Sequence, residues 1–122
     1  MRLTAHATVL LVDEVQRALD YYRDRLGFGV TSYDTDPEHY GYASRDNCHV
    51  HFARFAGEPP RPNGELFDVY VYVDDVEALH AELVERGADV LHEPVDRAYG
   101  LREIRVRDPH GYLLAFGKLL DS

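Results

Sequence analysis

The chain repeats a short motif once, and the spacing between the two copies is half of its length. Val12-Asp13-Glu14-Val15 is echoed by Val73-Asp74-Asp75-Val76, a shift of 61 residues in a sequence of 122. A glycine follows each copy at a similar distance, as Gly27 and Gly87. Because a solenoid needs about three or more stacked repeats, a motif present only twice predicts two supersecondary modules.

Each module is predicted to contain a strand, a helix and then three strands. In the first module, a strand is expected over 7–12, and the acidic pair Asp13-Glu14 suits a helix N-terminus. Apolar residues then recur at helical spacing from Val15 to Leu26, and Gly27 ends the helix. The three strands that follow are expected at 28–35, 39–45 and 48–55.

The second module is expected to repeat this order. Its first strand is predicted over 67–73, and a helix that carries Val76 and Leu83 ends at Gly87. Further strands are predicted near 89–92, 102–107 and 112–117. Asp108-Pro109-His110-Gly111 has Pro second and Gly fourth, as in a type I turn, so the last two strands should form a hairpin.

The two modules are expected to make a single domain of the α+β class. Clustered Pro and Gly preclude regular structure between them. Module one is therefore assigned to 1–56, the linker to 57–66 and module two to 67–122. We expect these tandem βαβββ modules to form a curled mixed sheet around a cleft.

The charge balance excludes some classes of partner. The 13 basic and 22 acidic side chains give a formal net charge of −9 at pH 7, whereas a nucleic-acid binder needs a basic surface. No apolar run approaches the roughly 18 residues of a membrane span, and the first residues lack a signal peptide's apolar stretch. The single Cys48 cannot form an intrachain disulfide. We therefore expect a cytoplasmic protein that contacts neither nucleic acid nor membrane.

Three short motifs carry a resemblance to a known family. Arg23-Asp24-Arg25-Leu26-Gly27-Phe28 follows the first helix, Val73-Asp74-Asp75-Val76 precedes the second, and Arg107-Asp108-Pro109-His110-Gly111-Tyr112 precedes the last strand. On a duplicated frame, this order resembles the vicinal-oxygen-chelate superfamily, which includes glyoxalase I, bleomycin-resistance proteins and extradiol dioxygenases. The resemblance covers nearly the whole chain and implies the fold. It implies less about function, because one fold hosts many chemistries.

The resemblance also allows a test for a metal site. Enzymes of that superfamily hold a divalent metal with His on the first strand of a module and Glu on the last, which suits Lewis-acid catalysis. The matched positions here are Ala7, His51, Asp68 and Ala115. Alanine cannot bind a metal, so the match implies no metal, no cofactor and no catalytic residue. The alternative is a metal-dependent lyase, isomerase or dioxygenase that uses His51, Asp68 and a further ligand such as His49.

Aromatic and ionisable side chains near the expected cleft predict a binding pocket instead. Residues that alternate along a strand share a face, and several pairs in this chain alternate in this way. Tyr99 lies just before the Gly100-Leu101-Arg102-Glu103 stretch. The predicted ligand-binding residues are Tyr40, Tyr42, His49, His51, Asp68, Tyr70, Tyr72 and Tyr99.

This arrangement is similar to the bleomycin-resistance branch, which carries aromatics at these places, lacks the metal ligands and sequesters a large planar, cationic drug as dimers. The resemblance implies a homodimer that binds a planar, cationic small molecule, such as an antibiotic. Tyrosine faces stack on planar rings and cations, and Asp68 in an acidic protein favours a positive ligand. The chain departs from that branch in having no Trp, which leaves the identity of the ligand open.

Structural interpretations exist for the same residues. The tyrosines can serve sheet packing, the two histidines can be structural, and Asp68 can be a solvated strand end. Arg105 and Arg107, with Glu103 nearby, are expected on an exposed or interfacial face, with an anion site as the alternative. A third class of function is a regulatory or structural subunit whose cleft is vestigial.

Overall fold

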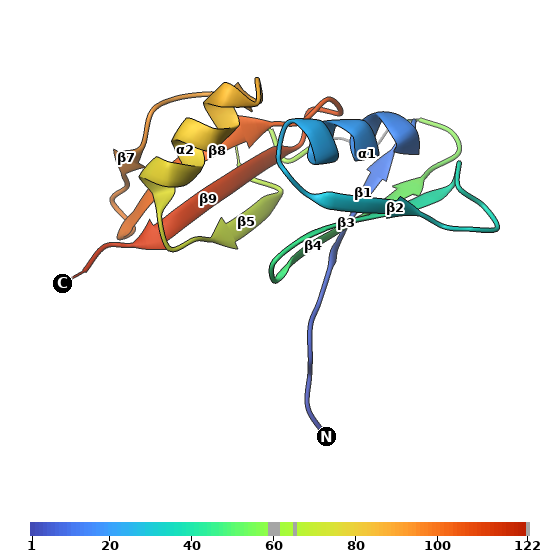
Figure 1. The fold of residues 1–122 in the computed structure, drawn as a ribbon, viewed down its shortest axis with the longest axis horizontal. Helices are drawn as coiled ribbons and strands as arrows, with labels where there is room; N and C mark the ends of the chain where they lie inside the picture. The colour runs from blue at the N-terminus through green and yellow to red at the C-terminus, as the bar shows by residue number, and fades with distance from the viewer. Residues whose placement is uncertain (59–61, 65, 122) are drawn as a thin grey trace. The chain divides into compact units, whose positions relative to one another are not determined.

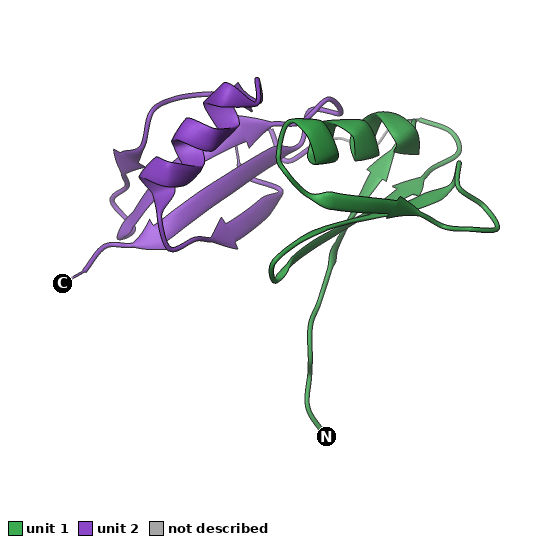
Figure 2. Cartoon of the chain, viewed as in Figure 1, with its two compact units in different colours: residues 1–60 green, residues 61–122 purple. Residues whose placement is uncertain are grey.

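The computed structural model describes residues 1–58, 62–64 and 66–121. In these residues the chain forms two helices and nine strands (Figure 1). It divides into two compact units, residues 1–60 and residues 61–122 (Figure 2). The boundary falls within the predicted linker at 57–66, part of which lies outside the described residues.

Unit 1 folds as a four-stranded sheet, called sheet A, with helix α1 on one face. The strands are β1 (Thr8–Val12), β2 (Gly29–Ser32), β3 (Tyr40–Arg45) and β4 (Cys48–Arg54), and α1 spans Val15–Asp24. Their order is β1-β4-β3-β2, with β1 parallel to β4 and the other pairs antiparallel. A parallel pair needs a crossover connection, which α1 and the strands after it provide.

Helix α1 packs on sheet A through its apolar side. Val15, Leu19 and Tyr22 are buried, and the Tyr22 ring meets Phe52 of β4 with 4.8 Å between the ring centroids. The helix comes so close to Gly41 of β3 that a methyl group there would lie 2.8 Å from Val15 Cγ1. The absence of a side chain at position 41 therefore permits this packing.

Unit 2 repeats this plan as sheet B, with helix α2 (Val76–Glu85) on one face. Its strands are β5 (Val69–Tyr72), β6 (Asp89–Val90), β7 (Val95–Asp96), β8 (Leu101–Arg107) and β9 (Leu113–Leu119). The order is β5-β9-β8-β6, β7 also pairs with β8, and β5 is parallel to β9. The strand predicted near 89–92 is β6, which ends at Val90, and β7 is a further strand of two residues that the sequence pattern does not predict.

Both helices begin and end where the sequence predicts. The side chain of Asp75, the N-cap of α2, accepts a hydrogen bond from the Ala78 N–H at 3.0 Å. Gly27 and Gly87 follow the helices with φ of 77°, a left-handed conformation that glycine adopts without strain. No helix in the described part of the chain is long and apolar enough to cross a membrane.

A tight turn joins β8 to β9 at Asp108–Gly111, as predicted. The Gly111 N–H donates to the Asp108 carbonyl at 3.0 Å. The Asp108 carboxylate accepts the backbone N–H groups of His110 and Tyr112, each at 2.9 Å. Asp108 is 4% exposed, so these bonds offset the cost of burying its charge.

The two sheets share one register of strand pairing. Tyr42 pairs with His51 in sheet A, and at the equivalent position in sheet B Arg105 pairs with Ala115. The α+β class and the two βαβββ modules are therefore confirmed. Their strands pair as two mixed sheets, one in each unit.

Candidate functional site

Each sheet has one face covered by its helix and an opposite face, here called the helix-free face. In sheet A, Gly41 of β3 meets α1. Because side chains alternate along a strand, Tyr40 and Tyr42 point to the helix-free face. His51 lies directly opposite Tyr42 on β4, and His49 is two residues away on the same strand. The predicted site residues of unit 1 therefore lie on one face.

Tyr40, Tyr42 and His51 form a cluster of rings on that face. The Tyr42 ring lies 5.0 Å from the His51 ring and 5.3 Å from the Tyr40 ring, measured between centroids. The Tyr40 hydroxyl lies 3.1 Å from His51 Nδ1, within hydrogen-bond distance. Contacts of this kind stabilise an aromatic cluster, so the three rings hold one another in place without a ligand.

The rest of this face carries a histidine, a serine hydroxyl and apolar side chains. His49 Nδ1 lies 2.8 Å from the hydroxyl of its cross-strand partner Ser44. On β1, Val9 and Leu11 are 50% and 42% exposed. The described strands of sheet A place no carboxylate or guanidinium group on the helix-free face, which is therefore aromatic and apolar.

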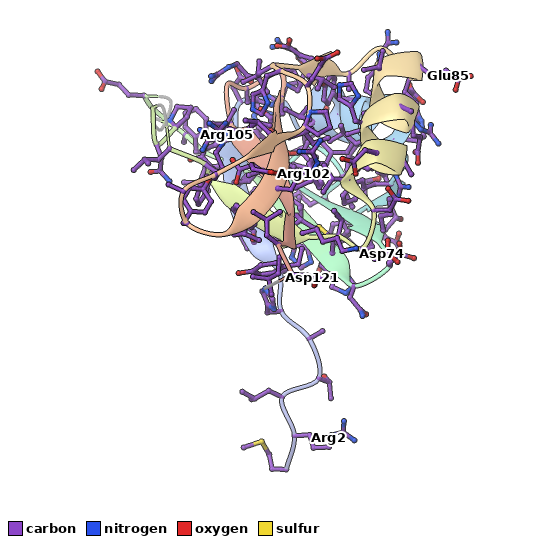
Figure 3. The ribbon with its side chains drawn as sticks, turned by 90° about the vertical axis from the view of Figure 1, so that its left-hand side faces the viewer. Arg2, Asp74, Glu85, Arg102, Arg105 and Asp121 are labelled. Atoms are coloured by element: carbon purple, nitrogen blue, oxygen red, sulfur yellow. The ribbon has the colours of Figure 1, made fainter. Side chains whose placement is uncertain are left out.

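In sheet B, β5 and β8 contribute most of the helix-free face. Arg102 of β8 forms an ion pair with Glu77 of α2, so Arg105, three residues further along the strand, points away from the helix. Figure 3 shows both arginines on β8, with Arg102 on the side nearer α2. Tyr70 shares the face of Arg105, because both residues pair with Ala115 of β9.

Tyr70 lies between two other aromatic rings. The Phe67 ring is 4.9 Å from it and the Tyr72 ring 5.4 Å, measured between centroids. The Arg105 guanidinium carbon lies 5.5 Å from the centroid of Phe67, a cation–π arrangement. Tyr72 is 70% exposed and therefore accessible. This second cluster differs from that of sheet A in containing a cation.

Glu103 lies beneath the rings of sheet B and is fully buried. Its Oε1 accepts hydrogen bonds from the hydroxyls of Tyr70 at 2.9 Å and Tyr99 at 2.6 Å. Its Oε2 accepts Nε–H groups from Arg105 at 2.7 Å and Arg97 at 3.2 Å. A buried carboxylate is stable as an anion only with donors of this kind.

This network shifts the pKa values of its members. Burial by itself raises the pKa of Glu103, but hydrogen bonds from Tyr99, Arg105 and Tyr70 outweigh it and lower the pKa below 4.5. Burial, with a smaller contribution from the hydrogen bond to Glu103, raises the pKa of Tyr70 and of Tyr99 above 10.0. At neutral pH the carboxyl is therefore ionised, and both phenols donate to it.

Gly117 of β9 allows Tyr70 to reach Glu103. A methyl group at position 117 would collide with the Tyr70 hydroxyl and lie 3.0 Å from Tyr70 Cζ. The Tyr70 side chain therefore lies across β9 at a point where no other side chain projects. Ala53 occupies the equivalent position in sheet A.

Asp68 bonds to the local backbone. Its Oδ1 accepts the Asn63 N–H and its Oδ2 accepts the Leu113 N–H, both at 2.9 Å. These bonds connect the segment before β5 to the first residue of β9. The structure thus gives Asp68 a structural contact, and its role in ligand binding stays a prediction.

The residues at the superfamily's metal-ligand positions do not fit a divalent ion. Ala7 and Ala115 have no donor atom, His51 Nδ1 contacts Tyr40, and both Asp68 oxygens accept backbone N–H groups. Within the described part of either unit, no three His, Cys, Asp or Glu side chains are grouped as a metal site requires.

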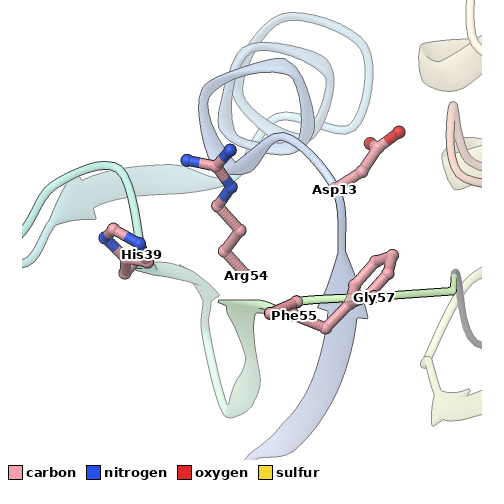
Figure 4. Close-up of a pocket in the computed structure, with 6 residues that line it drawn as sticks. Asp13, His39, Arg54, Phe55 and Gly57 are labelled. Carbon is pink, nitrogen blue, oxygen red and sulfur yellow. The ribbon is translucent and has the colours of Figure 1, made fainter.

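A surface hollow of about 500 Å³ lies near the end of β4 in unit 1 (Figure 4). The residues that line it are Asp13, His39, Arg54, Phe55, Ala56 and Gly57. His39 Nδ1 is already paired with Asp36 at 2.5 Å. None of the predicted ligand-binding residues lines this hollow, so it is a different place from the predicted site.

Sequence reasoning missed the central role of Glu103. The predicted exposed or interfacial face around Arg105 is wrong for Glu103, whose side chain is 0% exposed. The sequence did contain a signal for the contact between Glu103 and Arg105, because residues two apart on a strand point to the same face. The partners Arg97 and Tyr99 carried no such signal, since they precede β8 and approach Glu103 through the fold.

Known proteins share this fold across almost their entire length. The structure of TioX from Micromonospora sp. ML1 is similar, with a TM-score of 0.74 and 25% identity, over 96% of this chain and 99% of that one. A glyoxalase-related enzyme from Clostridium phytofermentans has a TM-score of 0.76 at 17% identity, with 98% of each chain covered. The uncharacterized protein YraH of Bacillus subtilis is 27% identical over 124 residues, which cover 91% of this chain and 94% of YraH.

A family model agrees with the fold and with the motifs. The model described as "Glyoxalase/Bleomycin resistance protein/Dioxygenase superfamily" matches residues 4–116. The predicted superfamily is confirmed, while the bleomycin-resistance branch within it stays a prediction. The chain therefore belongs to the glyoxalase/bleomycin resistance protein/dioxygenase superfamily.

Proposed function

We propose that this protein is a binding protein that sequesters a planar small molecule against the aromatic rings of its helix-free faces. The observation that carries the proposal is that each sheet gathers such rings on that face. The rings are Tyr40, Tyr42 and His51 in sheet A and Phe67, Tyr70 and Tyr72 in sheet B. Aromatic side chains offer a large contact area at low entropic cost, which suits stacking on a flat ligand.

The state of the polar side chains supports binding without catalysis. Glu103 is ionised and hydrogen-bonded at both oxygens, so it is a poor proton acceptor for a ligand. The raised pKa values of Tyr70 and Tyr99 make these phenols weak acids at neutral pH. With alanine at two of the matched ligand positions, the proposed mechanism is non-covalent and needs neither metal nor cofactor.

A homodimer is part of the proposal. β1 is an edge strand of sheet A and exposes the apolar side chains of Val9 and Leu11. Unpaired strand edges and exposed apolar residues favour a symmetric partner. The expected cytoplasmic location likewise stays a prediction.

The charge of the ligand is a separate question. The sequence predicts a cation from Asp68 and from the net charge of −9. In the structure both Asp68 oxygens accept backbone N–H groups. The support that remains for a cation is the net charge and the electron-rich tyrosine faces.

Thermal unfolding with planar polycyclic compounds tests the proposal. Acridines, phenazines and anthraquinones should include a compound that raises the Tm, because a ligand at about 100 times its Kd stabilises the folded state by about 2.7 kcal/mol. Tyr42→Leu and Tyr72→Leu should reduce that shift. Tyr21→Leu, in helix α1, is a matched control that should leave it unchanged. If no compound raises the Tm, or if the bound compound is recovered chemically altered, the proposal is wrong.

Two further measurements test the proposed absence of a metal and the proposed homodimer. Metal analysis after purification without chelator should find no tightly held divalent ion, and about one ion per chain that His51→Ala removes would contradict the proposed mechanism. Sedimentation of the full chain should give twice the mass of the monomer. A monomer that still binds the compound would refute the homodimer alone.

A further inference from the structure

We infer that the helix-free face of sheet A selects a planar ligand with a carbonyl oxygen, which accepts a hydrogen bond from His51 Nε2. The inference rests on the proposed function and adds the class of ligand, a flat ring system that carries a ketone, quinone or lactam oxygen at its edge. Tyr40 is the positioning residue, because its hydroxyl decides which nitrogen of His51 carries the proton.

The Nε2 atom of His51 is accessible to a ligand. Within the described part of the chain, the side chain of His51 makes its hydrogen bond through Nδ1, to the Tyr40 hydroxyl. No nitrogen or oxygen of His51 in that part is both buried and without a hydrogen-bond partner. Since no described residue bonds to Nε2, this atom must reach the solvent. His51 therefore offers a polar atom beside the rings of its own cluster.

The hydroxyl of Tyr40 fixes the tautomer of His51. The hydroxyl oxygen and Nδ1 are 3.1 Å apart, and either atom can donate in principle. A phenol O–H is more acidic than an imidazole N–H, and an imidazole nitrogen is more basic than a phenol oxygen. The hydroxyl therefore donates and Nδ1 accepts. In the neutral ring the proton is then on Nε2, which becomes a donor.

The angle between the rings gives His51 a different role from Tyr42. Their planes are 86° apart, with 5.0 Å between the centroids. Two rings at this angle cannot both stack on one flat ligand. A ligand that stacks on Tyr42 can instead use His51 as a hydrogen-bond donor, so an oxygen at the edge of the ligand adds affinity that a hydrocarbon edge lacks.

Other polar groups of the two helix-free faces do not give the same selectivity. His49 Nδ1 lies 2.8 Å from the Ser44 hydroxyl, which is a much weaker acid than a phenol and leaves both tautomers of His49 open. In sheet B, the two phenols that contact Glu103 already donate to its carboxylate. The described phenol–imidazole pair of sheet A is thus the group that favours an acceptor on the ligand.

Three flat tricyclic probes of nearly equal size test the inference. They are 9-fluorenone, which carries a carbonyl oxygen, carbazole, which carries an N–H group, and fluorene, which has neither. The Kd of each probe for the full chain is measured by equilibrium dialysis at neutral pH. Affinities are compared as ratios to fluorene, so that differences in stacking between protein variants cancel.

His51→Phe supplies the matched change in the protein, because it keeps a ring and removes the donor. The affinity ratio of fluorenone to fluorene should fall about fivefold, the value of one neutral hydrogen bond. The ratio of carbazole to fluorene should not fall, because Nε2–H cannot accept. His80→Phe, on α2, is the control and should change neither ratio. Circular dichroism and the Tm establish that each variant folds.

Infrared spectroscopy gives a direct signature of the hydrogen bond. The C=O stretch of fluorenone bound to the wild-type protein should lie at lower frequency than in an apolar solvent, and His51→Phe should reverse that shift. Tyr40→Phe should lower the ratio of fluorenone to carbazole, because Nδ1 then no longer has the donor that holds the proton on Nε2. A purely structural role of Tyr40 would weaken all three probes equally. If His51→Phe fails to fold, the infrared shift and the Tyr40→Phe ratio decide.

The outcomes separate the inference from the proposed function. If His51→Phe leaves the ratio of fluorenone to fluorene unchanged, if carbazole is the probe that loses affinity, or if Tyr42→Phe rather than His51→Phe reverses the infrared shift, the inference is wrong and planar binding stands. If none of the three probes binds while another planar compound raises the Tm, the inference fails alone. If no planar compound binds, the proposed function fails as well.

Discussion

The helix-free faces of sheets A and B occupy equivalent positions but carry different chemistry. Tyr40 and Tyr42 of β3 stand where β8 has Glu103 and Arg105. Sheet A thus presents rings that contact one another, whereas sheet B presents rings held by a buried carboxylate and two guanidinium groups. The same strand register therefore carries two different sets of side chains.

The faces that meet the helices differ much less. Phe52 and Phe116 occupy equivalent positions there, and both are buried. Packing against a helix requires apolar side chains of fitting volume, which constrains both copies in the same way. The opposite faces lack that constraint within their units, so their chemistry can diverge.

The largest expected effect comes from removing the acceptor that distinguishes sheet B. Glu103→Leu leaves the hydrogen bonds of two phenols and two guanidinium groups unmade and should lower the free energy of unfolding by about 3 kcal/mol. Tyr40→Leu, at the equivalent position of sheet A, should cost clearly less, because it removes one hydrogen bond and ring contacts. Urea unfolding measures both, and equal losses would show that the two faces do not differ energetically.

A smaller effect is expected at the position where Tyr70 crosses β9. Gly117→Ala should destabilise the protein by about 1–3 kcal/mol, because the new methyl group displaces the Tyr70 hydroxyl from Glu103. Ala53→Gly is the reciprocal change in sheet A and should cost about 0.5–1 kcal/mol. In a Tyr70→Leu background the cost of Gly117→Ala should largely disappear. A cost that persists there would mean that Tyr70 is not the obstacle.

Where sheet B has a network, the described ring cluster of sheet A has one side-chain hydrogen bond between its own members. Tyr40→Phe removes the bond to His51 Nδ1 and keeps the ring contacts, so the loss should be about 0.5–1.5 kcal/mol. Thermal unfolding at neutral pH measures it. A loss as large as that of Glu103→Leu would contradict the difference between the faces.

The smallest expected effect is a loss of stability that is absent at neutral pH and occurs only in alkaline solution. Because the pKa values of Tyr70 and Tyr99 are raised above 10.0 in the folded protein, their contribution to stability is complete below pH 10 and is lost as the pH rises above that value. Ultraviolet titration should therefore find a late ionisation for Tyr70 and for Tyr99, each identified by its loss in the Tyr70→Phe or Tyr99→Phe variant. Glu103→Gln should bring both toward the ordinary range, and Glu77→Gln, on α2, should not.

Much of the fold and part of the site could be predicted from the sequence. The alternation of Tyr40 with Tyr42 and of His49 with His51 placed these residues on one face, because strand periodicity is local. Asp68 was harder, because its partners are backbone groups, one of which lies 45 residues away at Leu113. No periodicity reports such a contact.

The repeat, the βαβββ order and the turns can be predicted from the sequence, because hydrophobic period, helix-ending glycines and Asp-Pro-His-Gly act over a few neighbouring residues. Which charged side chains are buried depends on the tertiary fold. In the sequence, Glu103 is one charged residue among several arginines. In the structure it is the centre of a hydrogen-bond network, because the side chain of Tyr70, 33 residues earlier, crosses β9 at Gly117 and donates to it. Burial depends on how distant strands pair, and the cost of burying a charge then dictates which donors must surround it.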